Sequence, residues 1–259
     1  MSGVVWKKVW RDLTHSKART LLAVLSTAVG VFALGLVFGM SGTMRAQMTE
    51  AHQETIPAHI TFSGGPFSPE IIKAVRRESG VGDAEGEIVA SLRWKFEGEE
   101  TWRNGQVIAR ADYESQPMNL VRLVEGRWPT KRVLGMDRVS SRHFEVKPGT
   151  TILADFGGRE RAVSVAGIVH DHDVLSPEMG GQVTFYTTPE TVAWLTDYGF
   201  GEDFNRLNVI LDSYSQEAAE ETARRIDDRL ERIELSVRGY EINNPNVHFM
   251  QDIVDAVLI

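Results

Sequence analysis

The longest apolar stretch of the chain lies close to its beginning. Residues 21–40 read LLAVLSTAVGVFALGLVFGM, twenty residues without a charge or a proline. A helix of that length is about 30 Å long, which matches the hydrocarbon thickness of a bilayer. A buried helix of a water-soluble protein rarely runs so far without a polar face. The pattern therefore predicts a transmembrane helix over residues 21–42.

A cleaved signal peptide is the alternative interpretation of the same stretch. The apolar part of a signal peptide is usually about 7–15 residues long, which is shorter than this run. Gly39 and Ser41 are nevertheless small enough for a cleavage site, so the alternative stays open. We expect an uncleaved helix.

Residues 1–20 form a basic leader in front of this helix. They carry five basic residues against the single acid Asp12, a net charge of +4, so the remaining 239 residues carry −12 of the total of −8. Basic residues flanking a transmembrane helix stay in the cytoplasm, which places everything after about residue 42 outside it. Apolar side chains recur in the leader at helical spacing, which is typical of an interfacial amphipathic helix: Val5, Trp6, Val9, Trp10 and Leu13. A disordered basic tail is the alternative.

After the apolar run, alternating and helical patterns predict an α+β domain. Residues 56–62 alternate as a half-buried strand does, Gly64-Gly65-Pro66 ends it, and Ser68-Pro69-Glu70 begins a helix. Residues 88–96 give the cleanest period-two pattern, and a further strand is expected over 106–111. This order is β-α-β-β.

The same order of elements recurs near the end. Residues 207–211 alternate, Ser215 is suited to cap a helix, and residues 235–242 predict a closing strand. One apolar stripe runs along the predicted helix: Ala219, Ala223, Ile226, Leu230 and Ile233. We therefore expect one split βαβ, ferredoxin-like domain from residues 43–116 and 201–248, with 117–200 as an inserted β-rich subdomain.

Composition excludes several classes of protein. The chain has no cysteine, which excludes disulfides, thiolate catalysis and iron–sulfur clusters. A net charge of −8 argues against a nucleic-acid partner. No GxxxxGK[ST], GxSxG or HExxH motif is present, so we expect no catalytic residue, no cofactor and no ATPase site in this chain. Trp102, Trp128 and Trp194 are candidate ligand platforms, but aromatic side chains on strands and helices mostly belong to the core.

One cluster has the residue types of a metal site. His170, His172 and Asp173 lie within four consecutive residues, together with Asp171. In a loop, two imidazoles and a carboxylate are suitable zinc ligands, whereas on a strand the two histidines would face away from the acids. We favour a solvated end of a strand, with these residues as weak metal candidates.

Several segments together resemble the MacB/FtsX-like permeases of ABC transporters. Residues 10–31, with Trp10-Arg11-Asp12-Leu13 and Val29-Gly30-Val31, are similar to the start of that family's first membrane helix. Val124-Glu125-Gly126-Arg127-Trp128-Pro129 resembles its extracytoplasmic GRW stretch. Residues 139–150 and 163–169 are similar to the helix and strands that follow in the family. Thr150 departs from the acid usual at that position, and the family's expected helix is only partly recognisable at 133–141.

The resemblance implies a permease subunit in the bacterial cytoplasmic (inner) membrane, with its N-terminus in the cytoplasm. Its implied partners are a cytoplasmic ABC ATPase that hydrolyses ATP, a second permease chain in a homodimer or heterodimer, membrane lipid and an extracytoplasmic adaptor. ATP hydrolysis would then drive export or extraction of a substrate through movements of the extracytoplasmic domain. The resemblance does not identify the substrate.

Two further expectations concern the organisation of the whole protein. The apolar residues 249–259 are similar to the start of a second transmembrane helix, so we expect the sequence to be part of a longer permease. The competing class is a single-pass membrane receptor or sensor with an extracytoplasmic ligand-binding domain. An adjacent ATPase gene and further apolar spans favour the permease.

Overall fold

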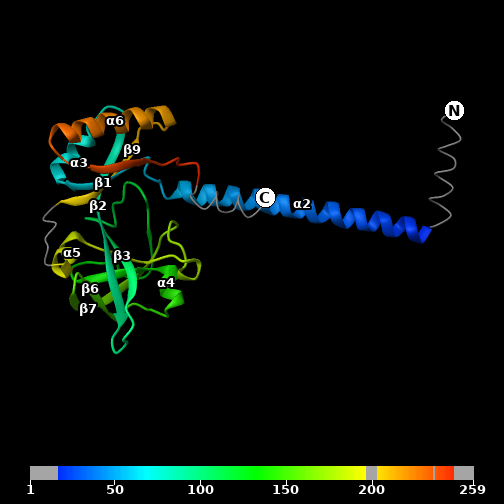
Figure 1. Cartoon of the computed structure of the whole chain (residues 1–259), viewed down its shortest axis with the longest axis horizontal. Coiled ribbons are helices and arrows are strands. Elements are labelled where there is room, and N and C mark those ends of the chain that lie inside the picture. Colours follow the sequence, from blue (N-terminus) through cyan, green and yellow to red (C-terminus); the bar gives the residue numbers. More distant parts are fainter. Residues whose placement is uncertain (1–16, 197–202, 236, 248–259) are drawn as a thin grey trace. The chain divides into compact units, whose positions relative to one another are not determined.

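The computed structural model describes residues 17–196, 203–235 and 237–247. The described residues fall into two compact units, residues 17–50 and residues 51–247. Figure 1 shows the elements of both units. The amphipathic part of the leader and the segment 249–259 lie outside the described residues.

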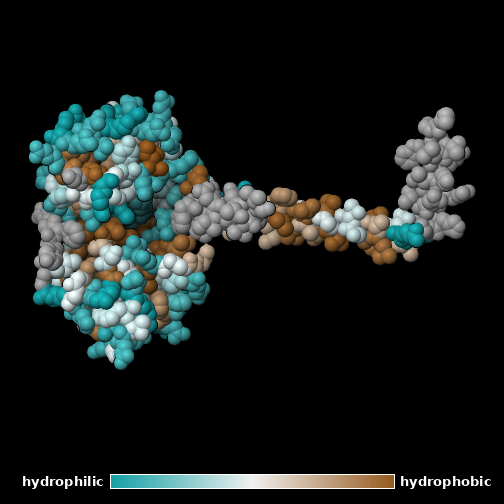
Figure 2. Space-filling view, viewed as in Figure 1, coloured by the Kyte–Doolittle hydropathy of each residue, from teal (hydrophilic) through white to brown (hydrophobic). Residues whose placement is uncertain are grey.

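Helix α2, Lys17–Glu54, contains the predicted apolar span. It continues twelve residues past residue 42, where the sequence pattern placed its end. The helix is long and apolar enough to cross a membrane by length and composition, and none of its most apolar window is buried. Figure 2 shows the apolar residues along it, and the exposed fractions reach 70% for Phe32 and 73% for Phe38.

Three hydroxyl groups of α2 form hydrogen bonds within the helix. Thr27, Ser41 and Thr43 each donate a hydrogen bond to the carbonyl oxygen four residues earlier, at 2.8–3.0 Å. A polar group without a partner in hydrocarbon costs several kcal/mol, on the order of 2–7, so these bonds suit a lipid environment. The helix therefore needs no protein neighbour for these three side chains.

A four-stranded antiparallel sheet forms the first part of the compact unit. Its order is β10-β1-β9-β2. The strands are β1 (Ile60–Phe67), β9 (Phe204–Leu211), β10 (Val237–Ile242) and the first half of β2 (Val81–Phe96). With α3 (Pro69–Val75) and α6 (Gln216–Arg232) this is the predicted split βαβ, ferredoxin-like arrangement. Figure 1 shows both helices beside this sheet.

Both helices begin where local sequence predicts. The hydroxyl of Ser68 accepts a bond from the Ile71 amide at 3.4 Å, and that of Ser215 accepts one from the Ala218 amide at 3.1 Å. The α6 stripe is buried against the sheet through Ala219, Ala223, Ile226 and Leu230. Ile233 was expected to continue that stripe, but it is 54% exposed, because the helix ends at Arg232.

The second half of β2 passes into a small barrel. Its neighbours are β3 (Arg103–Ala109), β8 (Val183–Thr187), β5 (Val133–Asp137), β7 (Arg159–His170) and β6 (Thr151–Phe156). The pairings β2–β3–β8–β5–β7–β6–β2 close a ring. Strand β4 (Arg122–Gly126) extends β7 outside it, and α4 (Arg138–His143), η1 (Pro177–Met179) and α5 (Pro189–Thr196) complete this part. Its core is centred on aromatic and aliphatic side chains such as Trp94, Phe185 and Leu134.

The structure differs from the sequence patterns at three places. The two hydrophobic cores separate within β2, near Glu87 and Ile88, whereas the pattern began the insertion at residue 117. Strand β1 begins at Ile60 because Ile56 lies in a turn with φ 50°. Gly64-Gly65-Pro66 does not end β1, since the strand continues through a shift of register to Phe67.

Candidate functional site

The end of α2 is bonded to the loop of residues 116–122, which we call the 116–122 loop. The carbonyl oxygens of Thr55 and Ile56 accept bonds from the amides of Leu120 at 2.7 Å and Asn119 at 2.9 Å. The side-chain oxygen of Asn119 accepts a further bond from the Ala58 amide at 2.8 Å. Asn119 has φ 47°, a left-handed conformation that asparagine tolerates better than most residues. The residues that follow the helix are therefore fixed by main-chain contacts.

Two exposed contacts add to this attachment. Arg122 Nη2 donates to Glu54 Oε2 at 3.1 Å, and Gln53 Nε2 donates to Asn246 Oδ1 at 2.8 Å. The Arg122–Glu54 pair is more than half exposed on both sides, so water and salt weaken it. These contacts position the last turn of the helix more than they stabilise it.

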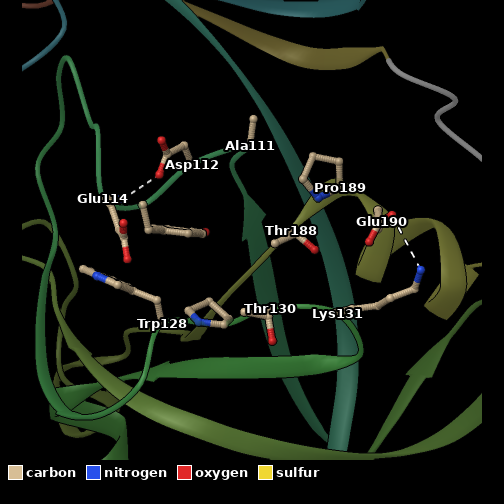
Figure 3. Close-up of a pocket in the computed structure, with 11 residues that line it drawn as sticks. Ala111, Asp112, Glu114, Trp128, Thr130, Lys131, Thr188, Pro189 and Glu190 are labelled. Atoms are coloured by element: carbon tan, nitrogen blue, oxygen red, sulfur yellow. Dashed lines mark hydrogen bonds and ion pairs between the residues drawn. The ribbon is translucent and has the colours of Figure 1, made fainter.

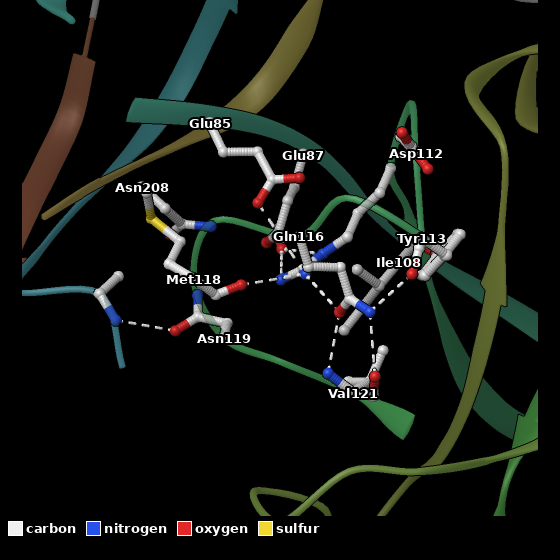
Figure 4. A network of polar contacts seen from close by, with 12 residues as sticks. Glu85, Glu87, Ile108, Asp112, Tyr113, Gln116, Met118, Asn119, Val121 and Asn208 are labelled. Carbon is white, nitrogen blue, oxygen red and sulfur yellow. Dashed lines mark hydrogen bonds and ion pairs between the residues drawn. The ribbon is translucent and has the colours of Figure 1, made fainter. Parts of the chain in front are cut away.

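Arg110 follows β3 and connects the 116–122 loop to β2. Figure 4 shows Glu87, Gln116 and Met118, three of the residues that it contacts. Its side chain is 4% exposed, and its Nε donates to Glu87 Oε1 at 2.7 Å. Its Nη1 donates to Gln116 Oε1 and to the Met118 carbonyl, each at 3.2 Å. A buried guanidinium is stable only when carboxylates and carbonyls take up its charge and its donors. Arg110 therefore holds together β2 and the 116–122 loop.

Gln116 uses both ends of its amide inside the loop. Its Nε2 donates to the carbonyls of Tyr113 at 2.7 Å and Val121 at 3.0 Å. Its Oε1 accepts from the Val121 amide at 2.8 Å as well as from Arg110. The contacts thus form a continuous path from the end of α2, through the loop and Arg110, to β2, and we call this set of contacts the junction.

The junction meets β2 at the point where that strand changes sheets. Glu87 is the last β2 residue paired with β9, opposite Arg206, and Ile88 is the first paired with β3. Arg206 Nη1 lies 3.8 Å from Glu87 Oε2, so an arginine from each part of the unit faces the same carboxylate. A shift of either part relative to the other must disturb this carboxylate.

Glu85 adds a titratable group to the junction. Burial raises its pKa to about 7, against the opposing effect of Arg110, and the charges of Glu87 and Asp83 raise it further. Its Oε2 lies 3.9 Å from Arg110 Nη1 and forms no hydrogen bond with the part of the chain that the structure describes. The charge of the junction therefore changes near neutral pH.

The three weak metal candidates lie at the end of β7. The rings of His170 and His172 are 4.3 Å apart, and burial with the nearby Arg138 lowers the pKa of His170 to about 4. The carboxylates are engaged elsewhere: Asp171 accepts from the Tyr186 hydroxyl at 2.7 Å, and Asp173 lies 3.7 Å from His52 Nδ1. Among the described residues no group of three or more His, Asp or Glu side chains is arranged to hold a metal.

The residues of the junction were not identified from the sequence. Glu85 and Glu87 alternate along β2 just before its apolar half, which is the pattern of one polar face on a strand. No local pattern indicates that the side chain of Arg110, 23 residues after Glu87, reaches these two carboxylates.

One family model matches most of this chain. The model of the MacB-like periplasmic core domain matches residues 20–229. No curated protein matches this sequence. The periplasmic region of MacB from Actinobacillus actinomycetemcomitans is 13% identical, with a TM-score of 0.47, and the match covers 79% of this chain and 94% of that one.

A second similar structure is the extracellular domain of the noncanonic ABC-type transporter YknZ from Gram-positive bacteria. It is 16% identical, with a TM-score of 0.46, and the match covers 72% of this chain and 99% of that one. The family assignment rests on the match of the domain model, which spans most of the chain, including the junction. The chain belongs to the family of proteins with a MacB-like periplasmic core domain.

Proposed function

We propose that the chain is the N-terminal part of a permease subunit of an ABC transporter of the MacB/FtsX type. The apolar helix α2 would cross the cytoplasmic membrane, with the leader in the cytoplasm and residues 51–250 outside. Three findings support this role: the family of the domain, the length and apolarity of α2, and the basic residues before it. ATP would be hydrolysed by a separate subunit, and residues 1–259 contain no phosphate-binding loop.

The observation that carries the proposal is the continuous path of contacts from α2 to β2. ATP binding by the partner subunits would displace the membrane helices of two associated permease chains. The 116–122 loop is bonded to the residues that end and follow α2, so it would move with them. Arg110 would pass that displacement to Glu87, where the four-stranded sheet and the barrel meet. Chemical energy would thus open or close the extracytoplasmic domains, exporting or extracting a substrate.

The direct test is association with an ATPase. The full-length permease should co-purify with the ABC ATPase encoded beside it, and the complex in lipid nanodiscs should hydrolyse ATP. A Walker-A lysine variant of the ATPase is the control for activity. A chain that binds no ATPase, and whose gene adjoins a signalling kinase, would instead be the single-pass receptor.

The orientation has its own test, which the absence of native cysteine makes simple. Ser213→Cys lies in an exposed loop of the extracytoplasmic domain, and Ser2→Cys lies in the leader. A membrane-impermeant maleimide should label the first variant in cells with a permeabilised outer membrane, and the second only after lysis. Labelling of Ser2→Cys in those unlysed cells would overturn the orientation.

A further inference from the structure

A second site lies on the barrel, in an open pocket of about 520 Å³ (Figure 3). Three segments enclose it: the loop after β3 with Asp112 to Glu114, the segment Trp128 to Lys131 between β4 and β5, and the start of α5 at Thr188 to Glu190. Its volume is within the range of small-molecule sites, about 300–1,000 Å³. Among the described residues, only these three segments line the pocket.

The floor of the pocket is a pair of stacked aromatic rings. Tyr113 and Trp128 lie 5.3 Å apart between ring centroids, at an interplanar angle of 16°. Tyr113 is buried and Trp128 is partly exposed, and both pack on a small cluster with Val121, Val169 and Tyr186. The indole of Trp128 thus lines the pocket and is stacked on the ring of Tyr113.

This floor is rigid because polar contacts fix it from below. The Tyr113 hydroxyl donates toward the carbonyls of Ile108 and Thr187, at 2.9 and 3.0 Å, and accepts from the Thr187 amide at 3.1 Å. The buried hydroxyl of Thr191 contacts the Thr130 carbonyl at 3.1 Å and accepts from the Arg132 amide at 3.0 Å. Tyr113, on which the indole of Trp128 stacks, is therefore held in place before a ligand binds.

The rim carries more negative than positive charge. Asp112, Glu114 and Glu190 line the pocket with one cation, Lys131, which lies 3.7 Å from Glu190. One oxygen of Asp112 accepts the amides of Glu114 and Ser115, at 2.7 and 3.3 Å, and shapes the turn. No described cationic side chain forms a salt bridge with Asp112 or Glu114. In Figure 3 these two residues lie on the same side of the pocket as Trp128.

We propose that this pocket binds a small organic cation with a flat apolar body, such as an aromatic quaternary ammonium. The apolar body would lie against Trp128 and Pro129, and the positive charge would face the indole and the carboxylates of Asp112 and Glu114. A cation over an indole face is attracted by the ring quadrupole, and nearby carboxylates add to the attraction. An anion is repelled by the same rim, and a neutral molecule gains only the apolar contact.

The test uses the full 259-residue chain in detergent, labelled with 5-fluorotryptophan. The fluorine resonance that disappears in Trp128→Phe is that of Trp128, one of six tryptophans in the sequence. Benzyltrimethylammonium is the probe, because it is small and stays in water rather than in the micelle. Benzyl alcohol and benzenesulfonate are its neutral and anionic counterparts. The probe should shift the Trp128 resonance saturably, and each counterpart should bind at least about tenfold more weakly.

Matched variants separate the rim from the general charge of the protein. Asp112→Asn with Glu114→Gln should weaken binding of the probe about fivefold or more, while asparagine keeps the oxygen that shapes the turn. Asp228→Asn with Glu231→Gln removes the same charge from the exposed face of α6 and should leave binding unchanged. The other five fluorine resonances report whether each variant is folded.

Three results would overturn the proposal. They are equal binding of benzyltrimethylammonium and its two counterparts, an unchanged Trp128 resonance, or undiminished binding by the variant with Asp112→Asn and Glu114→Gln. The measurement needs neither ATPase nor membrane, so its failure leaves the proposed permease role untouched.

Discussion

Arg110 and Glu87 form a buried ion pair at the residue where β2 leaves the four-stranded sheet for the barrel. Their side chains are 4% and 3% exposed, and Arg110 Nε lies 2.7 Å from Glu87 Oε1. Both parts of the compact unit therefore share one carboxylate, which Arg206 approaches from β9. Relative movement of the two parts would therefore change the surroundings of this pair.

Glu87→Gln should destabilise the protein by about 3 kcal/mol, because it leaves the buried guanidinium of Arg110 without its main counter-charge. Glutamine keeps an acceptor of nearly the same shape, so the loss reports charge rather than packing. Denaturant unfolding of the full chain in detergent measures the change. Glu231→Gln, exposed on α6, is the control and should stay within about 0.5 kcal/mol of wild type. An equally small effect of Glu87→Gln would show that the pair contributes little.

Glu85 should make stability fall as the pH rises from about 4.5 to about 7. Its folded pKa of about 7 exceeds the ordinary value of 4.5, so the folded chain holds a proton that the unfolded chain has lost. The protonated carboxyl group adds its full stabilisation at a pH below the pKa of the unfolded chain. That stabilisation is lost as the pH rises through the pKa of the folded chain. Burial causes the shift, Glu87 and Asp83 add to it, and Arg110 and Arg76 oppose it.

Comparison with Glu85→Gln isolates the contribution of this carboxyl group, since the titrations of groups that do not interact with it cancel in the difference. The variant should gain about 1–3 kcal/mol relative to wild type between pH 5 and pH 8. Unfolding in denaturant at a series of pH values measures it. A difference that does not change with pH would contradict the raised pKa.

Gly126→Ala should lower the stability of the protein by more than the strain of a positive φ alone explains. Gly126 has φ +79°, and an added Cβ would lie 2.3 Å from the Ala166 carbonyl oxygen on β7. Gly149 has φ +97° but open space around the same position, so Gly149→Ala measures the conformational cost by itself, about 1 kcal/mol. Thermal unfolding should show a lower Tm for Gly126→Ala than for Gly149→Ala. Equal Tm values would mean that β4 moves away from β7 without cost.

Asn119→Gly should loosen the attachment of α2 while keeping the left-handed backbone. The Ala58 amide loses its acceptor, and its hydrogen exchange should become about tenfold faster, which corresponds to the net strength of one hydrogen bond. Asn244→Gly removes a comparable bond to the Asn246 amide at an exposed site and should leave Ala58 unchanged. Hydrogen exchange resolved by NMR or mass spectrometry gives the comparison. Unchanged protection at Ala58 would show that the Asn119 side chain does not hold this segment.

Local features of the fold follow from the sequence because short-range physics determines them. The starts of α3 and α6 depend on Ser68 and Ser215, whose hydroxyls accept amides three residues later. The length of the apolar run predicts α2 in the same way. The alternating pattern of residues 56–62 predicted a strand that begins too early. Alternation alone does not distinguish a strand from the turn that ends at Ile56, where φ is 50°. The ferredoxin-like order was expected from two repeats of the same element pattern, and the pairings confirm it.

The sequence by itself determined the apolar span, the helix starts, the α+β class and the absence of a phosphate-binding loop. Tertiary structure alone decided that β2 belongs to two sheets, that Arg110 reaches Glu87, and that Tyr113 stacks beneath Trp128. Strand register and the burial of a charge depend on partners far away in the chain, and single residues carry no signal of those partners. The residues proposed for coupling and binding can therefore be identified only from the folded structure.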